Sequence, residues 1–333
     1  MKKVIAIAVA VVLLLAMAMT VPVAAQTEWH VYAGESIQDA IDNAYDGDTI
    51  YVHEGTYDEN LLIDGVDLTL IAVGEVTIVA QMPVPGHGDT IQIYNSTCTI
   101  DGFTVQGGMG GIYARGMSLF SETETNVTIC NNTVEQYIKN GITVNGDLAT
   151  ARIFNNTATG SGETGDIAQN GIQFGYGATG TAHRNTVDGN WYTGAEWSAC
   201  GILIFESDDV SVQGNRVSGS QTGIAVETWG WYEPSASENK IVRNNVDGSQ
   251  WGISVAAYAW IYSTSDSFAN NNKVVNNVVT AEEGDVGIIV ETESYGSFSG
   301  VADNNKIIHN QVSGYETAID DTGTASKMHA NVY

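Results

Sequence analysis

The chain is poor in proline, cysteine and basic residues. Its 333 residues include 4 Pro, 3 Cys and 12 Lys or Arg, against 39 Asp or Glu, for a formal net charge of −27. A chain this acidic repels nucleic acid and anionic membranes, so neither is expected as a partner. Few prolines argue against polyproline and collagen structures. The three Cys, at positions 98, 130 and 200, cannot all pair and lack the spacing of a zinc site. At least one of them is expected to be a small buried apolar residue.

Long apolar runs are absent except at the beginning of the chain. Lys2 and Lys3 precede the apolar residues 4–19, and small residues follow as far as Ala25. This order predicts a signal peptide over residues 1–25, with a retained N-terminal anchor as the alternative. We therefore expect an exported protein, secreted or at the cell surface. Residues 26–333 are expected to form a single domain with no membrane segment.

Two short patterns recur along the chain in a constant order. The first is Gly-Ile or Ala-Ile followed by an apolar strand, with the first residue at Gly111, Gly141, Gly171, Gly201, Gly223, Gly252, Gly287 and Ala318. The second is an apolar strand that ends in Asn, mostly with a Val-bearing strand after it, as in 128–134, 152–156, 212–217, 241–246, 274–278 and 307–312. Two marks at one shared period predict a solenoid of stacked repeats.

The shortest repeat, residues 201–222, shows how such a coil would be built. It contains three short strands, at 202–205, 210–213 and 216–218. Stacking in register at about 4.8 Å per coil would give each strand its hydrogen bonds. Alternation places Ile202 and Ile204 inside and Leu203 and Phe205 outside. The recurrent Asn suits the left-handed bend between two strands, and stacked amides would form an internal ladder.

The beginning of the expected mature chain predicts a short helix that covers one end of the column. Ser36 can cap a helix over residues 36–45, with Asp39 three positions later. Ile37, Ala40, Ile41 and Ala44 would form its apolar face. An end cap of this kind keeps the first coil of a solenoid from exposing its core.

Residues 36–41, 47–52 and 55–59 resemble the opening of right-handed parallel β-helix proteins, the pectin-lyase-like superfamily that includes chains named after the copper-associated periplasmic protein NosD. Residues 100–105 resemble the coil signature of the same superfamily. The resemblance implies an all-β fold over residues 30–333, a right-handed parallel β-helix solenoid with the short N-terminal capping helix. It implies no single activity, because the superfamily holds lyases, hydrolases, esterases and non-enzymes.

Long inserts indicate where a site would form. Two precede a Gly-Ile strand, at 160–170 and 188–200, and three follow one, at 228–239, 257–272 and 292–305. They should therefore rise from opposite edges of one sheet, whose outward face becomes the floor of a groove. In enzymes of the resembling superfamily, the active cleft lies on a comparable face.

Aromatic residues are concentrated in these inserts, and six of the seven Trp lie between 191 and 260. Aromatic rings suit stacking on sugar rings. The predicted carbohydrate-binding residues are Trp197, Trp229, Trp231, Tyr232, Trp260 and Tyr262. The alternative is that these rings only anchor the long loops onto the column.

Carboxylates accompany the rings. The candidate catalytic residues are Glu206, Asp208, Asp209, Glu227 and Glu291, and two of them could form a glycosidase pair about 5–9.5 Å apart. Glu206, Asp208 and Glu227 could instead bind Ca²⁺, the one cofactor considered. A solvated acidic edge without chemistry is the alternative to both.

The polygalacturonase motifs of the superfamily are not met, since no Arg-x-Lys pair is present. Arg115 is the only basic residue in the outward column that could serve a lyase, and it is far from the aromatic inserts. Glycosylation is predicted at the sequons of Asn95 and Asn126. Asn131 is another sequon, but we expect it in an inward turn.

The sequence leaves two main functions open. The first is an exported β-helix protein that binds extracellular glycan, and that as an enzyme would be a polysaccharide lyase or glycoside hydrolase. The second is a non-catalytic structural or adhesive module that contacts a component of the cell envelope. A NosD-like accessory role in metal handling ranks below both.

Overall fold

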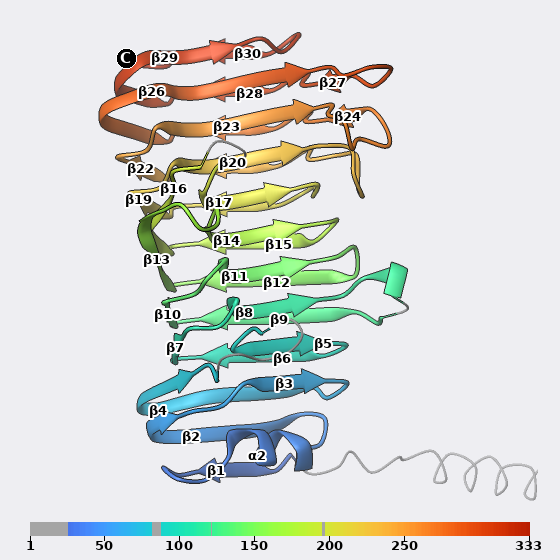
Figure 1. The fold of residues 1–333 in the computed structure, drawn as a ribbon, viewed down its shortest axis with the longest axis vertical. Coiled ribbons are helices and arrows are strands. Elements are labelled where there is room, and N and C mark those ends of the chain that lie inside the picture. Colours follow the sequence, from blue (N-terminus) through green and yellow to red (C-terminus); the bar gives the residue numbers. More distant parts are fainter. Residues whose placement is uncertain (1–25, 82–87, 121, 195–196) are drawn as a thin grey trace, which may run out of the picture.

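The chain forms a column of stacked coils in the computed structural model, with the first coil at the base and the last at the top (Figure 1). The structure describes residues 26–81, 88–120, 122–194 and 197–333. The predicted signal peptide at 1–25 lies outside these ranges. The named strands pair in parallel from coil to coil, as the solenoid prediction requires.

Each coil contributes strands to three faces of the column. The floor face, which carries the Gly-Ile strands, consists of β3 (Leu61–Asp64), β5 (Ile91–Tyr94), β8 (Gly110–Arg115), β11 (Asn140–Asn145), β14 (Asn170–Gly175), β17 (Cys200–Phe205), β20 (Thr222–Thr228), β23 (Trp251–Tyr258) and the end of β26 (Val278–Glu293).

The second face carries the strands that end at the recurrent Asn. It consists of β1 (Glu28–Val31), β2 (Asp48–Tyr57), β4 (Leu68–Val79), β6 (Thr97–Asp101), β9 (Thr125–Cys130), β12 (Ala149–Phe154), β15 (Thr179–His183), β18 (Ser211–Gln213), β21 (Lys240–Val242), β25 (Lys273–Val275), β28 (Lys306–Ile308) and β30 (Lys327–His329). The long strands β2 and β4 begin on this face and continue, from Gly55 and Val76, onto the third face, where the end of β4 pairs with β7.

The third face closes each coil before the next floor strand. It consists of β7 (Thr104–Gln106), β10 (Thr133–Glu135), β13 (Thr157–Thr164), β16 (Thr186–Tyr192), β19 (Arg216–Ser218), β22 (Asn245–Asp247) and the beginnings of β26 and of β29 (Gln311–Asp321), whose ends lie on the floor face. A separate two-stranded sheet joins β24 (Ser267–Phe268) to β27 (Gly300–Val301), and a 3-10 helix, η1, spans Ser118–Phe120.

The core lies inside the column and follows the predicted alternation. Ile202 and Ile204 have no exposed surface, and in register they meet Ile224 and Val226 of the next coil. Each such buried aliphatic side chain contributes about 1.5–3 kcal/mol. The outward residues of the same strands are free to form a surface, so the floor face can carry a site without disturbing the core.

An asparagine ladder runs up one inner corner of the column. The Asn244 amide oxygen accepts hydrogen bonds from the backbone N–H of Asn215, at 2.9 Å, and from its Nδ2, at 3.0 Å. The amides of the ladder are those of Asn132, Asn156, Asn185, Asn215, Asn244, Asn277, Asn310 and Asn331. The predicted internal ladder is confirmed.

The left-handed bend and the ladder fall on two neighbouring residues of the repeat, whereas both were expected at one Asn. Positive φ belongs to the residue before each ladder Asn, for example Asn155 at 57° and Arg243 at 56°. That residue turns the chain at the exposed corner, while the next side chain points inward to form the ladder. Asn131 is therefore exposed and its neighbour Asn132 is buried, which corrects the expectation of an inward Asn131.

The capping helix is confirmed as α2 (Ile37–Asn43) at the base of the column (Figure 1). The Ser36 hydroxyl accepts from the Asp39 N–H at 3.1 Å, and Ile37, Ala40 and Ile41 are buried. The Glu59 carboxylate also accepts from the N–H groups of Ile37 and Gln38, at 2.9 and 3.0 Å. These bonds satisfy donors that every helix leaves free at its first turn.

Cys98, Cys130 and Cys200 are all unpaired and buried, so the cysteines act as small core residues. Across the part of the chain that the structure describes, none of the helices has the length and apolar character needed to cross a membrane.

Candidate functional site

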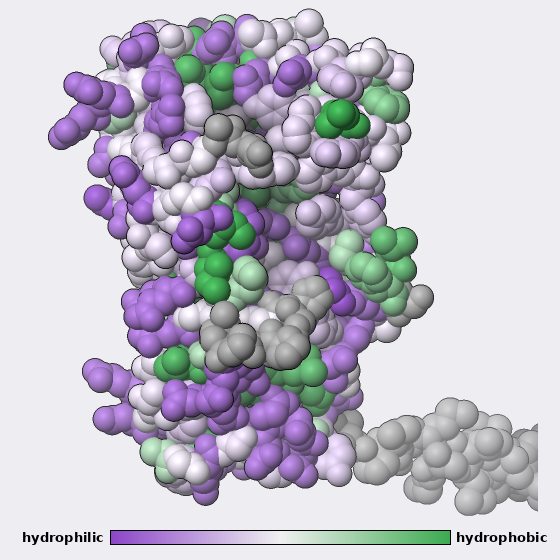
Figure 2. All heavy atoms as spheres, in the orientation of Figure 1, coloured by the Kyte–Doolittle hydropathy of each residue, from purple (hydrophilic) through white to green (hydrophobic). Residues whose placement is uncertain are grey.

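A pocket of about 560 Å³ opens on the floor face, across the coils of β17, β20, β23 and β26. This volume is typical of small-molecule sites. Figure 2 shows this side of the column hollowed between the protruding loops. The residues that line the pocket are Gly194, Trp197, Ser198, Gln221, Thr222, Glu227, Trp229, Gln250, Trp251, Ser254, Tyr258, Trp260, Ile289, Glu291 and Glu293.

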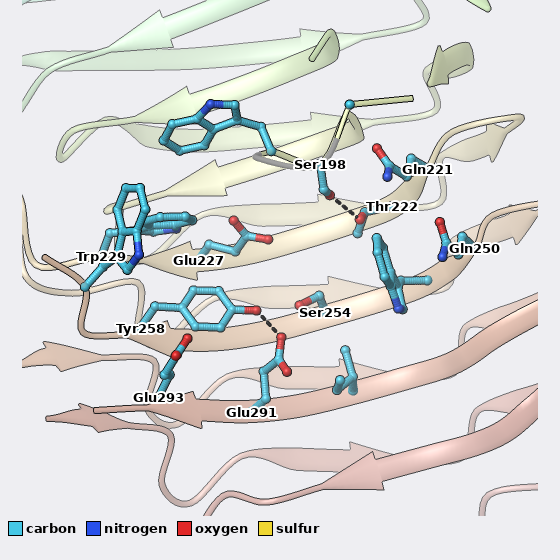
Figure 3. Close-up of a pocket in the computed structure, with 15 residues that line it drawn as sticks. Ser198, Gln221, Thr222, Glu227, Trp229, Gln250, Ser254, Tyr258, Glu291 and Glu293 are labelled. Carbon is cyan, nitrogen blue, oxygen red and sulfur yellow. Dashed lines mark hydrogen bonds between the residues drawn. The ribbon is translucent and has the colours of Figure 1, made fainter. Parts of the chain in front are cut away.

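The pocket joins the loops of both edges of the floor face, as their positions in the sequence predicted. Trp197 and Ser198 come from the insert before β17, whereas Trp229 and Trp260 come from the inserts after β20 and β23. The parallel register stacks these inserts one coil apart, so residues distant in sequence face one cavity (Figure 3).

Two carboxylates stand in one outward column of the floor. Glu227 is in register with Ala256, and Ala256 with Glu291, so two coil steps separate the glutamates. At about 4.8 Å per step their Cα atoms lie about 10 Å apart. Ala256, which separates them along the column, is fully buried and does not line the pocket.

The Glu227 carboxyl has an unusual environment. Burial raises its pKa to about 7, and the charge of Glu291 adds to this rise. At neutral pH Glu227 is therefore present in both protonated and ionised forms. A carboxyl group with this property can donate a proton to a ligand or accept one from it.

Tyr258 lies between the side chains of Glu227 and Glu291 and donates its hydroxyl to the Glu291 carboxylate (Figure 3). Burial raises the pKa of Tyr258, and the charges of Glu227 and Glu291 raise it further. The phenol therefore stays protonated and holds the Glu291 carboxylate in place.

Several polar lining residues were missed by the sequence-based reasoning. Ser254 faces outward between the buried Ile253 and Val255, and Gln221 and Gln250 each stand two residues before a repeat glycine. Strand alternation and the shared position in the repeat were the signals that could have found them. These hydroxyl and amide groups supply hydrogen bonds beside the aromatic rings.

Three predicted carbohydrate-binding residues line the pocket, namely Trp197, Trp229 and Trp260. The Trp229 ring lies 5.3 Å from that of Trp197 and 5.4 Å from that of Trp260, measured between centroids. Trp197 is 42% exposed. The rings thus pack on one another, as anchors of the loops would, and they also present surface to the cavity.

The other three predicted aromatic residues do not line the pocket. Trp231 packs behind Trp229 and against Phe205, at 5.2 and 5.8 Å between ring centroids. Tyr232 contacts Tyr176 on another part of the face. Tyr262 packs edge-on against Trp260 and is 67% exposed. Only Tyr262 is placed to extend a binding surface outward from the rim.

Glu206 belongs to the loop scaffold. Its fully buried carboxylate accepts hydrogen bonds from four backbone N–H groups, those of Trp229, Trp231, Tyr232 and Glu233, at 2.7–3.4 Å. Burial raises its pKa, and these donors oppose the rise. Both oxygens are already engaged, so Glu206 anchors the 229–233 loop, and it is not among the residues that line the pocket.

Asp208 and Asp209 also lie outside the pocket. Asp208 accepts from the hydroxyl of Ser235 and the N–H of Ser237, at 2.8 and 2.6 Å, and Asp209 is exposed at a bend with φ of 57°. The predicted Ca²⁺ ligands Glu206, Asp208 and Glu227 are not assembled. Among the described residues, no three His, Cys, Asp or Glu side chains are placed to share a metal ion.

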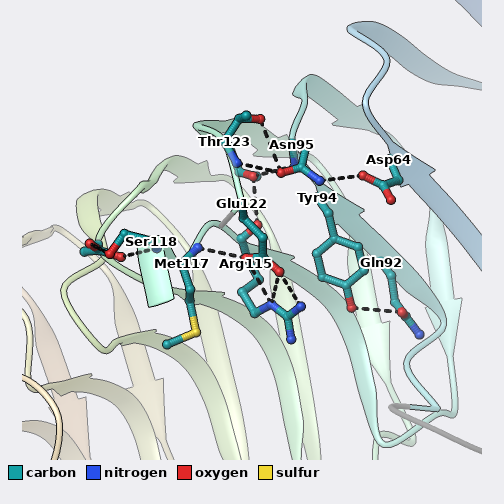
Figure 4. Close-up of polar contacts among 11 residues, drawn as sticks. Asp64, Gln92, Tyr94, Asn95, Arg115, Met117, Ser118, Glu122 and Thr123 are labelled. Carbon is teal, nitrogen blue, oxygen red and sulfur yellow. Dashed lines mark hydrogen bonds and ion pairs between the residues drawn. The ribbon is translucent and has the colours of Figure 1, made fainter. Parts of the chain in front are cut away.

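Arg115 is held far below the pocket by an ion pair with Glu122, which also accepts from the Met117 N–H at 2.8 Å (Figure 4).

The side chain of Asn95, one of the two predicted glycosylation sites, is hydrogen-bonded within the protein. Its Nδ2 donates to Asp64 at 2.7 Å, and its Oδ1 accepts from the Thr123 N–H. A glycan on Asn95 would have to break the bond to Asp64, whereas Asn126 stands in β9 with its side chain partly exposed.

Comparison with known families identifies the fold. Residues 89–260 match the right-handed β-helix region. The chain belongs to the right-handed β-helix family. The match covers the floor strands from β5 to β23 and therefore most of the pocket.

A curated relative is the cell surface glycoprotein of Methanothermus fervidus, 37% identical over 107 residues. The match covers 32% of this chain and 16% of that protein, so the two share a segment only. The relation nevertheless connects this β-helix chain with a protein of the cell surface.

Solved structures of carbohydrate-related proteins share the fold. The complex of XylC with xylose has a TM-score of 0.61 at 12% identity, over 89% of this chain and 70% of that one. Polygalacturonase from Erwinia carotovora has a TM-score of 0.58 at 13% identity, over 91% and 94%. The periplasmic alginate epimerase AlgG has 0.55 at 14%, over 91% and 84%. At these identities the likeness concerns the fold alone.

Proposed function

We propose that this protein is an exported β-helix, mature from about residue 26 as one domain, that binds extracellular glycan in the pocket on its floor face. The observation that carries the proposal is the convergence of Trp197, Trp229 and Trp260 with carboxylates and amides around one cavity. Aromatic faces pack on sugar rings, and the polar groups beside them bond to hydroxyls.

Its location follows from two observations of different kinds. The predicted signal peptide at 1–25 indicates export, and the related segment of a cell surface glycoprotein supports a position outside the cytoplasm. The carbohydrate-related proteins that share the fold support a glycan partner. Glycosylation at Asn126 is part of the same proposal.

A glycan array followed by calorimetry with the best binder tests the proposal. Trp197→Ala and Trp260→Ala each remove a ring from the pocket, and we expect each to weaken binding at least about tenfold. Tyr45→Ala removes a ring that is 72% exposed and remote from the pocket, and it should leave binding unchanged. Circular dichroism verifies that the variants keep their β structure.

If no glycan binds, or if both tryptophan variants bind as tightly as the unmodified protein, the pocket is not a glycan site. The structural or adhesive module would then be the better account of the column. The tryptophans would in that case act only as anchors for the loops.

The glutamate pair favours glycoside hydrolysis as a second candidate function. Glu227 has the raised pKa of a proton donor, and Glu291, two coil steps away, could activate water from the other side of a bound sugar. Release of reducing ends from the bound glycan, lost in Glu227→Gln, is the measurement for this step. Unchanged release in that variant excludes Glu227 as the donor.

A further inference from the structure

The charge of the pocket limits which sugars it can hold, and this inference depends on the proposed glycan site. Glu227, Glu291 and Glu293 line the cavity, and no Lys, Arg or His is among the described residues that line it. The basic residues between 190 and 300 are Arg216, Lys240, Arg243 and Lys273, which belong to the second and third faces or their turns. A carboxylate-bearing sugar would meet only like charge there.

Aromatic rings stand beside these carboxylates. Trp229 lies 5.4 Å from Trp260 and 5.5 Å from Tyr258, between ring centroids, and all three line the cavity with Glu227 and Glu291. The face of an aromatic ring carries negative potential and attracts cations. Rings and carboxylates together therefore form a surface that complements a positively charged group.

Two polar groups that line the pocket have no hydrogen-bond partner within the described part of the protein. The Ser254 hydroxyl, on a residue that is 5% exposed, has no hydrogen bond within the described part of the protein. Gln221 is 8% exposed, and its Oε1 accepts from the Ala199 N–H at 3.0 Å, while its Nε2 is free there. Neither atom is sealed from solvent, so both can be reached from the cavity and can bond to the hydroxyl groups of a ligand.

We infer that the pocket binds a sugar that carries a cationic nitrogen, as in an amino-sugar glycan with free amines. Ser254 and Gln221 would bond to its hydroxyls, while the carboxylates and the ring faces would hold the positive nitrogen. The same pocket should bind a neutral sugar less tightly and reject uronic acids. The overall charge of −27 would further draw a cationic chain toward the protein.

Calorimetry with three oligosaccharides of equal length tests this inference. They are an N-trimethylated glucosamine oligomer with permanent positive charge, the neutral N-acetylated oligomer and a galacturonate oligomer. We expect the cationic probe to bind about tenfold more tightly than the neutral one, which corresponds to about 1.4 kcal/mol, with the uronate weakest. Equal or tighter binding of the neutral or the acidic probe would overturn the inference.

Charge-neutralising variants locate the effect. Glu291→Gln and Glu293→Gln should each reduce the preference for the cationic probe about threefold or more. Glu282→Gln removes the same charge at an exposed position outside the pocket and should leave the preference unchanged. An equal loss in Glu282→Gln would attribute the preference to overall charge and contradict the inference.

The possible failures can be told apart. Binding of none of the three probes contradicts this inference, and the glycan array decides separately whether the proposed glycan site stands. Binding of the neutral probe without a charge preference contradicts the inference alone and leaves the proposed function standing.

Discussion

At the scale of single residues, two glutamates from adjacent coils have opposite roles. Burial raises the pKa of both Glu206 and Glu227. Glu206 is surrounded by backbone N–H donors that hold a loop, and Glu227 is beside an open cavity. The two carboxylates differ in their hydrogen-bond partners. Glu206 accepts from four backbone N–H groups and is a structural anchor, whereas Glu227 lacks such donors and is available to a ligand.

Glu227 should make the stability of the protein depend on pH. Its folded-state pKa of about 7 lies above that of an exposed glutamate, so the folded state binds the proton more tightly. This contribution to stability is fully present below about pH 4.5 and is lost as the pH rises through 7. Between pH 5 and pH 8 the loss is about 2–3 kcal/mol, since one pKa unit corresponds to about 1.4 kcal/mol.

Denaturant unfolding at pH 5 and pH 8 measures this effect. In Glu227→Gln the fall in unfolding free energy between these pH values should be smaller by about that amount. Burial also raises the pKa of Asp89, to about 6, so Asp89 adds a similar pH dependence of the unfolding free energy to the unmodified protein and to Glu227→Gln. The contribution of Glu227 is therefore the difference between these two proteins. An identical slope in the two would contradict the raised pKa of Glu227.

At the scale of the repeat element, the recurrent glycine has a packing reason. A Cβ on Gly223 would lie 2.2 Å from Cγ1 of Val246 and 2.5 Å from the carbonyl oxygen of Gly252 in the next coil. Gly201 has the same surroundings, with Val217 and Gly223. The floor strand and the third-face strand that follows it meet closely at this point, so glycine occupies this corner in the coils of Gly201 and Gly223.

Gly223→Ala should therefore destabilise the protein by about 1–3 kcal/mol, as overpacking of a close-packed core does. Gly165→Ala is the control, since the nearest atom to its Cβ would be 3.4 Å away and its position is exposed. Thermal unfolding of the two variants gives the comparison. Equal melting temperatures would mean that the corner can relax around a methyl group.

At the scale of the whole molecule, the column is close to one-dimensional. Strands pair with the coils directly below and above, as β20 does with β17 and β23. In such a solenoid, stability is approximately a sum over coils and their neighbouring interfaces. A change at one end should therefore act mainly on the coils beside it.

Glu59→Ala tests this local behaviour. The variant removes the carboxylate that accepts from Ser36, Ile37 and Gln38 at the beginning of α2. Hydrogen exchange should accelerate in α2, β2 and β3 and stay unchanged in β17 and β20. Asp58→Ala, at an exposed neighbouring acid, should change neither region. Faster exchange along the entire column would show that the coils unfold as one unit.

The fold was largely predictable because each coil repeats the same sequence pattern. Alternation places Ile202 and Ile204 inside, and the recurrent glycines and asparagines mark corners, so the coils and their stacking can be read from the sequence alone. The cap at α2 could be predicted as well, because Ser36 and the apolar positions after it form a local pattern.

The site was only partly predictable. The outward column that contains Glu227 and Glu291 follows from strand register, which the sequence by itself determined. Which carboxylates face the cavity was decided by the tertiary structure, because the inserts fold back without a repeating pattern. Backbone N–H groups of the inserts donate to the Glu206 carboxylate, and the Ser237 N–H donates to Asp208. Glu227 remains at the cavity. A hydrogen bond between a loop and a side chain some 25 residues away depends on the path of that loop in space, and local patterns carry no record of it.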